Sequence, residues 1–338
     1  MSRAHAKKPS RFWLYFPFLL LLLAAGAWTG WWFYARDRVD AAVDRWIAEQ
    51  TAAGAEVSYA SRTLSGFPFR YDLVFGKPDI RGADGVQWQG DELQLVMQPW
   101  DFRHIIARAP GHHVVTTALG LRNSVELDGK AAASLSWTDA GPRRIGLQSG
   151  DASAVINGHA YDLSGFVLNL APRPESPDDL MVALQWDKLS MDEAPATAPY
   201  LGTELGPSRL IGEVRNFFPA YAHSDHETGG LWRALLEVGG GVEVAQMLVD
   251  WGPMDLGGKA DLTIENGRAN GSIGLRLDHP DTLKEAMMAS GHWSTMEQTV
   301  LGTLEPASRN DGFLTLVVID SRIFAGPVPL GALPGSGS

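Results

Sequence analysis

Residues 259–277 have the sequence KADLTIENGRANGSIGLRL and contain the pattern that decides the fold. Apolar and polar side chains alternate over Lys259–Ile264 and again over Ala269–Leu277, which is the period of a strand with one buried face. Asn266-Gly267, which lies between them, is typical of a tight hairpin turn. Because strands joined by so short a turn must be antiparallel, this segment predicts an antiparallel hairpin.

The same pattern of short alternating segments and tight turns recurs along most of the chain. Further turn dipeptides are Asp84-Gly85, Asp128-Gly129, Asn157-Gly158 and Asp311-Gly312. The other alternating segments are Glu56–Tyr59, Phe67–Phe75, Gly85–Gly90, Leu93–Met97, Ser124–Leu127, Leu135–Trp137, Tyr161–Leu170, Leu180–Met191 and Phe313–Ile319. We therefore predict an α+β, mainly antiparallel fold: a long β-meander, forming a curved sheet or two packed sheets, with a few covering helices.

The N-terminal segment predicts a transmembrane anchor. Residues 1–11 carry basic but no acidic side chains, and residues 12–34 carry no charge. At about 1.5 Å per residue, a helix over residues 12–34 crosses a hydrocarbon layer of about 30 Å, and aromatic residues gather at both of its ends. Since basic residues favour the cytoplasmic side, we expect a cytoplasmic leader at 1–11, a single pass through a bacterial inner membrane at 12–34, and a periplasmic body.

An alternative for this segment is a cleaved signal peptide. Ala25-Gly26-Ala27 has the small-x-small form of a cleavage site. The aromatic residues that follow Ala27 favour a retained anchor, because a signal peptide needs no second interfacial belt.

Three helical regions and one loop organise the remaining chain. Residues 35–54 predict an amphipathic helix continuous with the anchor, because Val39, Val43, Trp46 and Ile47 recur at helical spacing. Helices are also expected near 230–251, divided by three consecutive glycines at 239–241, and near 280–288. The loop at 193–199 is the expected boundary between a first β-rich half, 55–192, and a second, 200–338.

Composition excludes several classes of function. The chain has 28 Lys and Arg against 39 Asp and Glu, and its formal net charge of -11 opposes non-specific binding of nucleic acid. With no Cys there is neither a thiolate metal site nor a Cys nucleophile. Phosphate-binding glycine loops and the serine-hydrolase elbow are also missing from the sequence. We therefore expect a protein that is not an enzyme and has no cofactor.

The strongest metal-like pattern is weak. His223 and His226 lie three residues apart, so one helix face could direct both imidazoles at a metal ion, with Glu227 as a base. No third ligand is located by the sequence, and a polar loop before Thr228 explains the pattern better. A hydrolase built from His223, His226 and Asp225 is therefore the least favoured hypothesis.

Two short motifs carry a resemblance. They are Gly66, Phe67, Pro68, Phe69 and Arg70 before an alternating strand, and Gly326, Pro327, Pro329 and Gly331 near the C-terminus. The chain resembles, end to end, an uncharacterised proteobacterial family with an N-terminal anchor and an exported β-rich body. It is also loosely similar to AsmA-like envelope proteins, which have long β-sheet grooves. The resemblance brings no catalytic residues and implies lipid handling or envelope assembly only by analogy.

The balance of strands and helices gives the functional expectation. Few helices are available to cover the apolar face of about a dozen strands, so either the sheet closes on itself or an apolar groove remains. Tryptophans that could line such a groove are Trp46, Trp88, Trp100, Trp137, Trp186, Trp232, Trp251 and Trp293. We expect binding of an apolar ligand or lipid. The alternative is a scaffolding module that binds an envelope protein partner.

Overall fold

The computed structural model describes residues 12–139, 141–225, 229–291, 301–302 and 312–333. Its helices are α1 (Phe12–Ala52), the 3-10 turn η1 (Pro199–Leu201), α2 (Phe217–His223), α3 (Gly230–Val238) and α4 (Pro280–Ser290). Its strands are β1 (Glu56–Ser58), β2 (Ser61–Ser65), β3 (Tyr71–Gly76), β4 (Asp79–Arg81), β5 (Gln87–Gly90), β6 (Glu92–Gln98), β7 (Asp101–Arg108), β8 (Gly111–Thr116), β9 (Arg122–Leu127), β10 (Ala132–Thr138), β11 (Gly141–Gln148), β12 (Asp151–Ile156), β13 (His159–Ser164), β14 (Val167–Arg173), β15 (Ser176–Trp186), β16 (Lys188–Met191), β17 (Glu204–Leu205), β18 (Ser208–Arg215), β19 (Gly240–Trp251), β20 (Met254–Glu265), β21 (Arg268–Asp278), β22 (Leu314–Ile319), β23 (Arg322–Ala325) and β24 (Val328–Ala332). The fold is mainly antiparallel sheet with a long apolar N-terminal helix and a few others, which confirms the predicted class.

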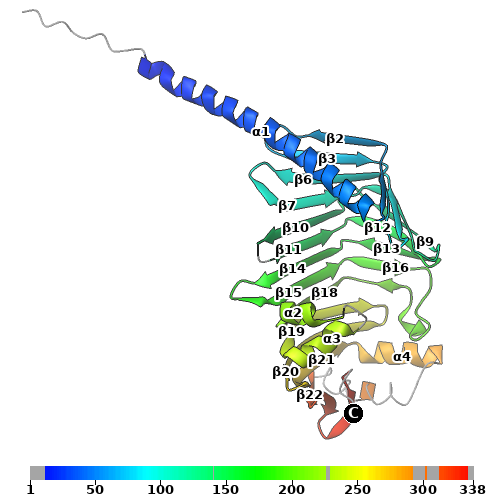
Figure 1. The fold of residues 1–338 in the computed structure, drawn as a ribbon. Helices are drawn as coiled ribbons and strands as arrows, with labels where there is room; N and C mark the ends of the chain where they lie inside the picture. The colour runs from blue at the N-terminus through cyan, green and yellow to red at the C-terminus, as the bar shows by residue number, and fades with distance from the viewer. Residues whose placement is uncertain (1–11, 140, 226–228, 292–300, 303–311, 334–338) are drawn as a thin grey trace, which may run out of the picture.

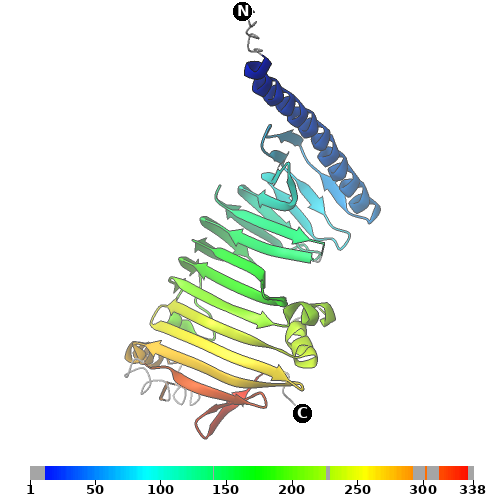
Figure 2. The ribbon, with the colours of Figure 1, turned by 90° about the vertical axis from the view of Figure 1, so that its left-hand side faces the viewer.

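The strands form one sheet that is folded lengthwise into two arms. Pairing follows β2-β3-β6-β7-β10-β11-β14-β15-β18-β19-β20-β21-β22-β23-β24 in the long arm. It follows β1-β4-β5-β8-β9-β12-β13-β16-β17 in the short arm. As far as β18, the chain builds two strands in one arm and then two in the other. The strands therefore stack in chain order, as Figures 1 and 2 show.

The line along which the two arms meet, which we call the crease, is made by short breaks within long strands. Only Ser149 and Gly150 separate β11 from β12, and Asp187 alone separates β15 from β16. At several breaks a glycine faces an aspartate of the neighbouring strand. A Cβ at these glycines would overlap or crowd the carboxylate, in the pairs Gly111 and Asp91, Gly150 and Asp128, Gly165 and Asp187, and Gly206 and Asp250.

Asp128 shows what these carboxylates do. Its Oδ2 accepts the backbone N–H of Asp151 at 3.2 Å, and its Oδ1 accepts those of Lys130 at 3.1 Å and Gly150 at 3.3 Å. Burial acts to raise the pKa of Asp128, but the backbone N–H donors together outweigh it and leave that pKa lowered. The carboxylate thus satisfies donors that the sheet cannot pair where the strands bend.

The structure confirms most of the predicted strands and corrects their limits. Tyr161–Leu170 and Leu180–Met191 each contain two strands, because the crease interrupts them at Gly165 and Asp187. Residues 67–70 form a turn before β3 rather than the start of a strand. Asp128-Gly129 forms a tight turn, as predicted, with Ala131 N–H donating to Asp128 O at 3.1 Å, but this turn lies at the crease and not in a hairpin: it joins β9 of the short arm to β10 of the long arm.

Two of the three helical predictions hold. Helix α1 continues without a break from the apolar segment to Ala52, and α4 covers the expected residues 280–288. The helix expected at 230–251 is wrong beyond Val238. Gly239 ends α3 at φ 79°, and residues 240–251 form β19, which pairs with both β18 and β20. Tertiary pairing on both sides outweighs the local helical spacing.

The boundary drawn at 193–199 does not interrupt the sheet. The connection between β16 and β17 contains η1, while β15 pairs directly with β18 from Leu180–Val214 to Trp186–Ser208. The long arm therefore runs on from the first half into the second.

Two substitutions of glycines with positive φ test whether the close contact between glycine and aspartate at the crease stabilises the fold. Gly165→Ala places a methyl group against Asp187, whereas Gly158→Ala, in the hairpin turn between β12 and β13, meets nothing within 4 Å. We expect Gly165→Ala to lower the free energy of unfolding by about 1–3 kcal/mol more than Gly158→Ala does. Chemical denaturation of the detergent-solubilised full chain measures both, and equal effects would show that backbone strain alone matters at Gly165.

Candidate apolar groove

One face of the long arm carries continuous rows of uncharged, mainly apolar side chains. The register pairs an unbroken row of uncharged side chains across it, namely Leu64, Leu73, Leu95, Ala107, Ala133, Leu147, Leu168, Leu184, Leu210, Met247, Gly258, Leu275 and Leu314. A parallel row two residues along contains Tyr71, Met97, Ile105, Leu135, Ile145, Leu170 and Val182. Since side chains alternate between faces, both rows lie on the same face.

The short arm continues this face across the crease. Its row consists of Leu127, Ala152, Leu163, Leu189 and Leu205, and it ends against Trp251 of β19. None of the three rows contains a charged residue. The two arms together therefore form a trough with an apolar inner face, which we call the inner face.

In the middle of the trough this face is uncovered. Leu135 is 42 % exposed and Leu147 is 37 % exposed, although both are aliphatic and lie in the inner rows. Buried apolar side chains instead gather in three clusters, one beside α1 and two beside the C-terminal strands. The described residues thus cover the two ends of the inner face and leave its centre open to solvent.

Helices α3 and α4 cover the C-terminal end. Leu235 of α3 packs in a cluster with Leu262 and Val318 of the inner face. Leu283 of α4 packs with Leu277 and with Leu201 of η1. This end of the trough has an ordinary packed core.

Helix α1 crosses the N-terminal end (Figure 1), and a cavity lies between it and the sheet. The cavity has a volume of about 980 Å³ and is lined by Trp31, Val39, Val43, Trp46 and Ile47 of α1. From the sheet it is lined by apolar side chains that include Leu73, Phe75, Leu95, Met97, Ile105 and Trp137. Among the residues that line it, Arg38 is the one with a charged side chain.

A second cavity, of about 530 Å³, follows in the crease below. It is lined from the long arm by Ala107, Ala133 and Leu147, and from the short arm by Leu127 and Leu163. Ile105 of the first cavity and Ala107 of the second lie on the same face of β7, because they are two residues apart. The two cavities therefore lie in succession along one groove.

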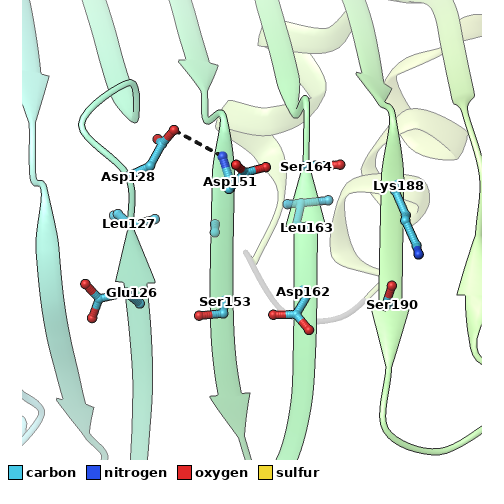
Figure 3. Close-up of a pocket in the computed structure, with 11 residues that line it drawn as sticks. Glu126, Leu127, Asp128, Asp151, Ser153, Asp162, Leu163, Ser164, Lys188 and Ser190 are labelled. Carbon is cyan, nitrogen blue, oxygen red and sulfur yellow. Dashed lines mark hydrogen bonds between the residues drawn. The ribbon is translucent and has the colours of Figure 1, made fainter.

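On the short arm the opposite, outer face of the sheet is polar (Figure 3). Across the short arm the register pairs Glu126, Ser153, Asp162, Ser190 and Glu204. These residues alternate with the apolar row on the same strands. The depression drawn in Figure 3 is lined by carboxylates, hydroxyls and Lys188, together with Leu127, Ala152 and Leu163, and it is open to solvent.

The first sequence motif holds α1 against the sheet. Gly66–Arg70 forms the turn between β2 and β3, where Pro68 O accepts a hydrogen bond from Trp28 Nε1 at 3.0 Å. Arg70 O accepts another from Trp32 Nε1 at 3.2 Å, and the Tyr71 hydroxyl donates to Trp32 O at 3.0 Å. Trp32 stacks on Tyr71 with ring centroids 5.1 Å apart and is buried. The motif therefore has a docking role.

The second motif ends the sheet. Gly326 at φ 58° turns the chain into β24, which contains Pro329 and Gly331 and pairs only with β23 among the described strands. Pro329 lies beside the register shift at Phe324, where a missing N–H is tolerated. Among the described strands β24 is thus an edge strand, where prolines are tolerated.

The histidine hypothesis receives no support. His223 lies at the end of α2 with its Nε2 3.1 Å from Glu237 Oε2 of α3, and Asp225 pairs with Arg233 at 2.8 Å. His226 lies outside the described residues. Within the described part of the chain, no group of three His, Asp or Glu side chains is placed to hold a metal ion.

The comparison with protein families gives one match. The model of a family of uncharacterized proteins conserved in bacteria, DUF2125, matches residues 32–334. The chain belongs to this family. No curated protein and no solved structure matches the chain. The DUF2125 match begins at Trp32, so it contains both sides of the contact between Trp32 and the motif turn, whereas Trp28 lies before the matched residues.

The sequence anticipated a groove but not which residues line it. Of the suggested tryptophans, Trp46 and Trp137 line the cavity under α1, whereas Trp88 stacks on His113 and Trp251 packs beside α4. Trp293 lies outside the described residues. Cross-strand register identifies the residues of the inner face, but it can be read only when the neighbouring strands are known.

Two neighbouring tryptophans test the docking of α1. Trp32 is 3 % exposed and Trp31 is 48 % exposed. We expect Trp32→Ala to lower the free energy of unfolding by about 3–5 kcal/mol, because it removes a buried ring and a hydrogen bond. Trp31→Ala should cost less than 1 kcal/mol, in the range of surface changes. Denaturation of the detergent-solubilised chain compares them, and a similar loss for both would contradict the docking role.

Proposed function

We propose that this DUF2125 protein is anchored in the bacterial inner membrane and binds the apolar chains of a lipid in its periplasmic trough, without catalysing a reaction. The observation that carries the proposal is the inner face, whose three rows contain no charged residue and whose centre, at Leu135 and Leu147, stays partly exposed between α1 and the C-terminal helices. An apolar face this long calls for an occupant, because monomeric proteins rarely leave extended apolar patches in water.

Apolar burial provides enough free energy for binding. Each methylene moved from water to an apolar surface contributes about 0.8 kcal/mol, so ten methylenes of an acyl chain give on the order of 8 kcal/mol before the cost of ordering the chain. The cavities of about 980 and 530 Å³ lie along the path that such a chain would follow. Their linings offer almost no hydrogen-bonding groups, which disfavours a polar ligand.

The length of the groove also suits lipid. Eight strands of the long arm, from β3 to β18, lie between β2 and β19. At about 4.8 Å between neighbouring strands they span on the order of 35 Å. The hydrocarbon of one leaflet is about 15 Å deep, half of a bilayer core of about 30 Å. The trough, including the part beneath α1, is therefore longer than the tails of one lipid molecule.

Location supports the same proposal. Over the described residues, one helix is long and apolar enough to cross a membrane, and it lies near the N-terminus. The basic residues before it favour a cytoplasmic N-terminus and a periplasmic body. The loose similarity to AsmA-like envelope proteins of proteobacteria also supports a place in the cell envelope. The acidic, Cys-free composition gave no catalytic motif, which supports the non-enzymatic part of the proposal.

The proposal predicts that lipid co-purifies with the full chain and depends on the inner face. Native mass spectrometry of the chain in a mild detergent, followed by organic extraction, should show a bound lipid. Leu147→Glu puts a charge on the inner face and should raise the dissociation constant for lipid about tenfold, equivalent to about 1.4 kcal/mol, which lowers the bound fraction. Because Leu147 is already partly exposed, the fold should tolerate the change.

The matched control is Asn169→Glu. Asn169 is exposed, pairs with Gly146 on the neighbouring strand, and points to the outer face. It should leave lipid binding unchanged. Equal loss in both variants, or a chain that carries no lipid at any stage, would overturn the proposal and favour an envelope protein partner as the occupant of the trough.

A further inference from the structure

Exposed aromatic side chains gather where α1 leaves the sheet. Phe69 is 69 % exposed and Phe67 is 49 % exposed in the turn between β2 and β3, and Trp100 is 59 % exposed in the turn between β6 and β7. Trp28 and Phe33 of α1 lie beside them. We call these five residues the aromatic collar.

Close contacts hold the collar together as one surface. The rings of Trp28 and Trp100 are 6.1 Å apart, and those of Phe33 and Phe67 are stacked at 6.0 Å. The hydrogen bond from Trp28 Nε1 to Pro68 O fixes the first turn against the helix. The two turns of the sheet therefore lie at the same height along α1 as residues 28–33.

The length of the helix sets that height relative to a bilayer. Counted from Phe12, about 20 residues are needed to cross a hydrocarbon core of about 30 Å, which places the far surface near Trp31. A tilted helix would use more residues and would bring the turns deeper. The turns that contact Trp28 and Phe33 must then lie in the headgroup layer rather than in free solution.

We infer that the aromatic collar is inserted in the outer headgroup layer of the same membrane, so that the sheet itself, and not only α1, contacts lipid. Tryptophan and phenylalanine suit this layer, because their rings are apolar and tolerate nearby polar groups. The charged neighbours Arg70, Asp101 and Arg103 are all exposed, so their side chains can remain among water and headgroups.

The cavity under α1 starts at the same height. Trp31 and Tyr34 line its upper part and lie next to the collar along the helix. A lipid chain would therefore enter the trough from the leaflet without crossing water. This inference rests on the anchoring part of the proposed function and not on lipid binding by the trough.

The absence of Cys makes a direct test practicable. Single-Cys variants Phe69→Cys and Trp100→Cys, each labelled with the fluorophore NBD, are reconstituted as full chains in phosphatidylcholine–phosphatidylglycerol vesicles. Quenching by a doxyl label on the lipid chains is compared with quenching by aqueous iodide. Ile319→Cys, exposed to 53 % on β22 at the other end of the sheet, is the matched control, and Leu21→Cys reports on the anchor.

We expect the labels at 69 and 100 to emit at shorter wavelength than the label at 319, with at least threefold stronger doxyl quenching and weaker iodide quenching. If the label at 21 is quenched by doxyl lipid while those at 69 and 100 behave like 319, the anchor stands and the collar inference is overturned. If the label at 21 is also accessible to iodide, the anchor itself fails. Loss of lipid from the trough would change neither readout.

Discussion

Cross-strand register is the constraint on which the rest of the structure depends. A shift of one residue in any pair would turn that strand's apolar side chains to the outer face and break the inner rows. The breaks at the crease matter for the same reason, because each strand must change direction without losing its alternation. Glycines such as Gly150 give the space for this bend, and carboxylates such as that of Asp128 accept the N–H groups that the bend leaves unpaired.

The positions of the helices determine which parts of the inner face are covered and which are open to solvent. α3 and α4 pack on the inner face at the C-terminal end, and α1 crosses it at the N-terminal end through Trp32 and Tyr71. Between these covers the same residue types stay half exposed. The covered ends supply stability in the usual way, and the open centre leaves apolar surface available to a ligand.

The sequence predicts local features of this protein well and long-range ones poorly. Alternation and Asn-Gly turns identify hairpins such as β20–β21, and the uncharged segment identifies α1, because both signals are local. The crease cannot be distinguished from a hairpin turn by composition: Asp128-Gly129 has the residues of a turn but joins strands of different arms. Residues 240–251 were predicted to continue a helix, yet they pair on both sides as β19. The motif Gly66–Arg70 was recognisable, but its contact with Trp28 and Trp32 depends on residues about 40 positions away.

The alternation of strand pairs between the arms makes the trough extensible. Inserting one strand pair in each arm would lengthen it by two strand spacings, about 9.6 Å, and would leave the register above and below unchanged. Lengthening or shortening the trough by such units leaves its two covered ends, at α1 and at α3 and α4, unchanged. Duplication or deletion of a short segment can therefore adjust the distance between α1 and the far end of the sheet in steps, while the pairing within each retained block of strands stays unchanged.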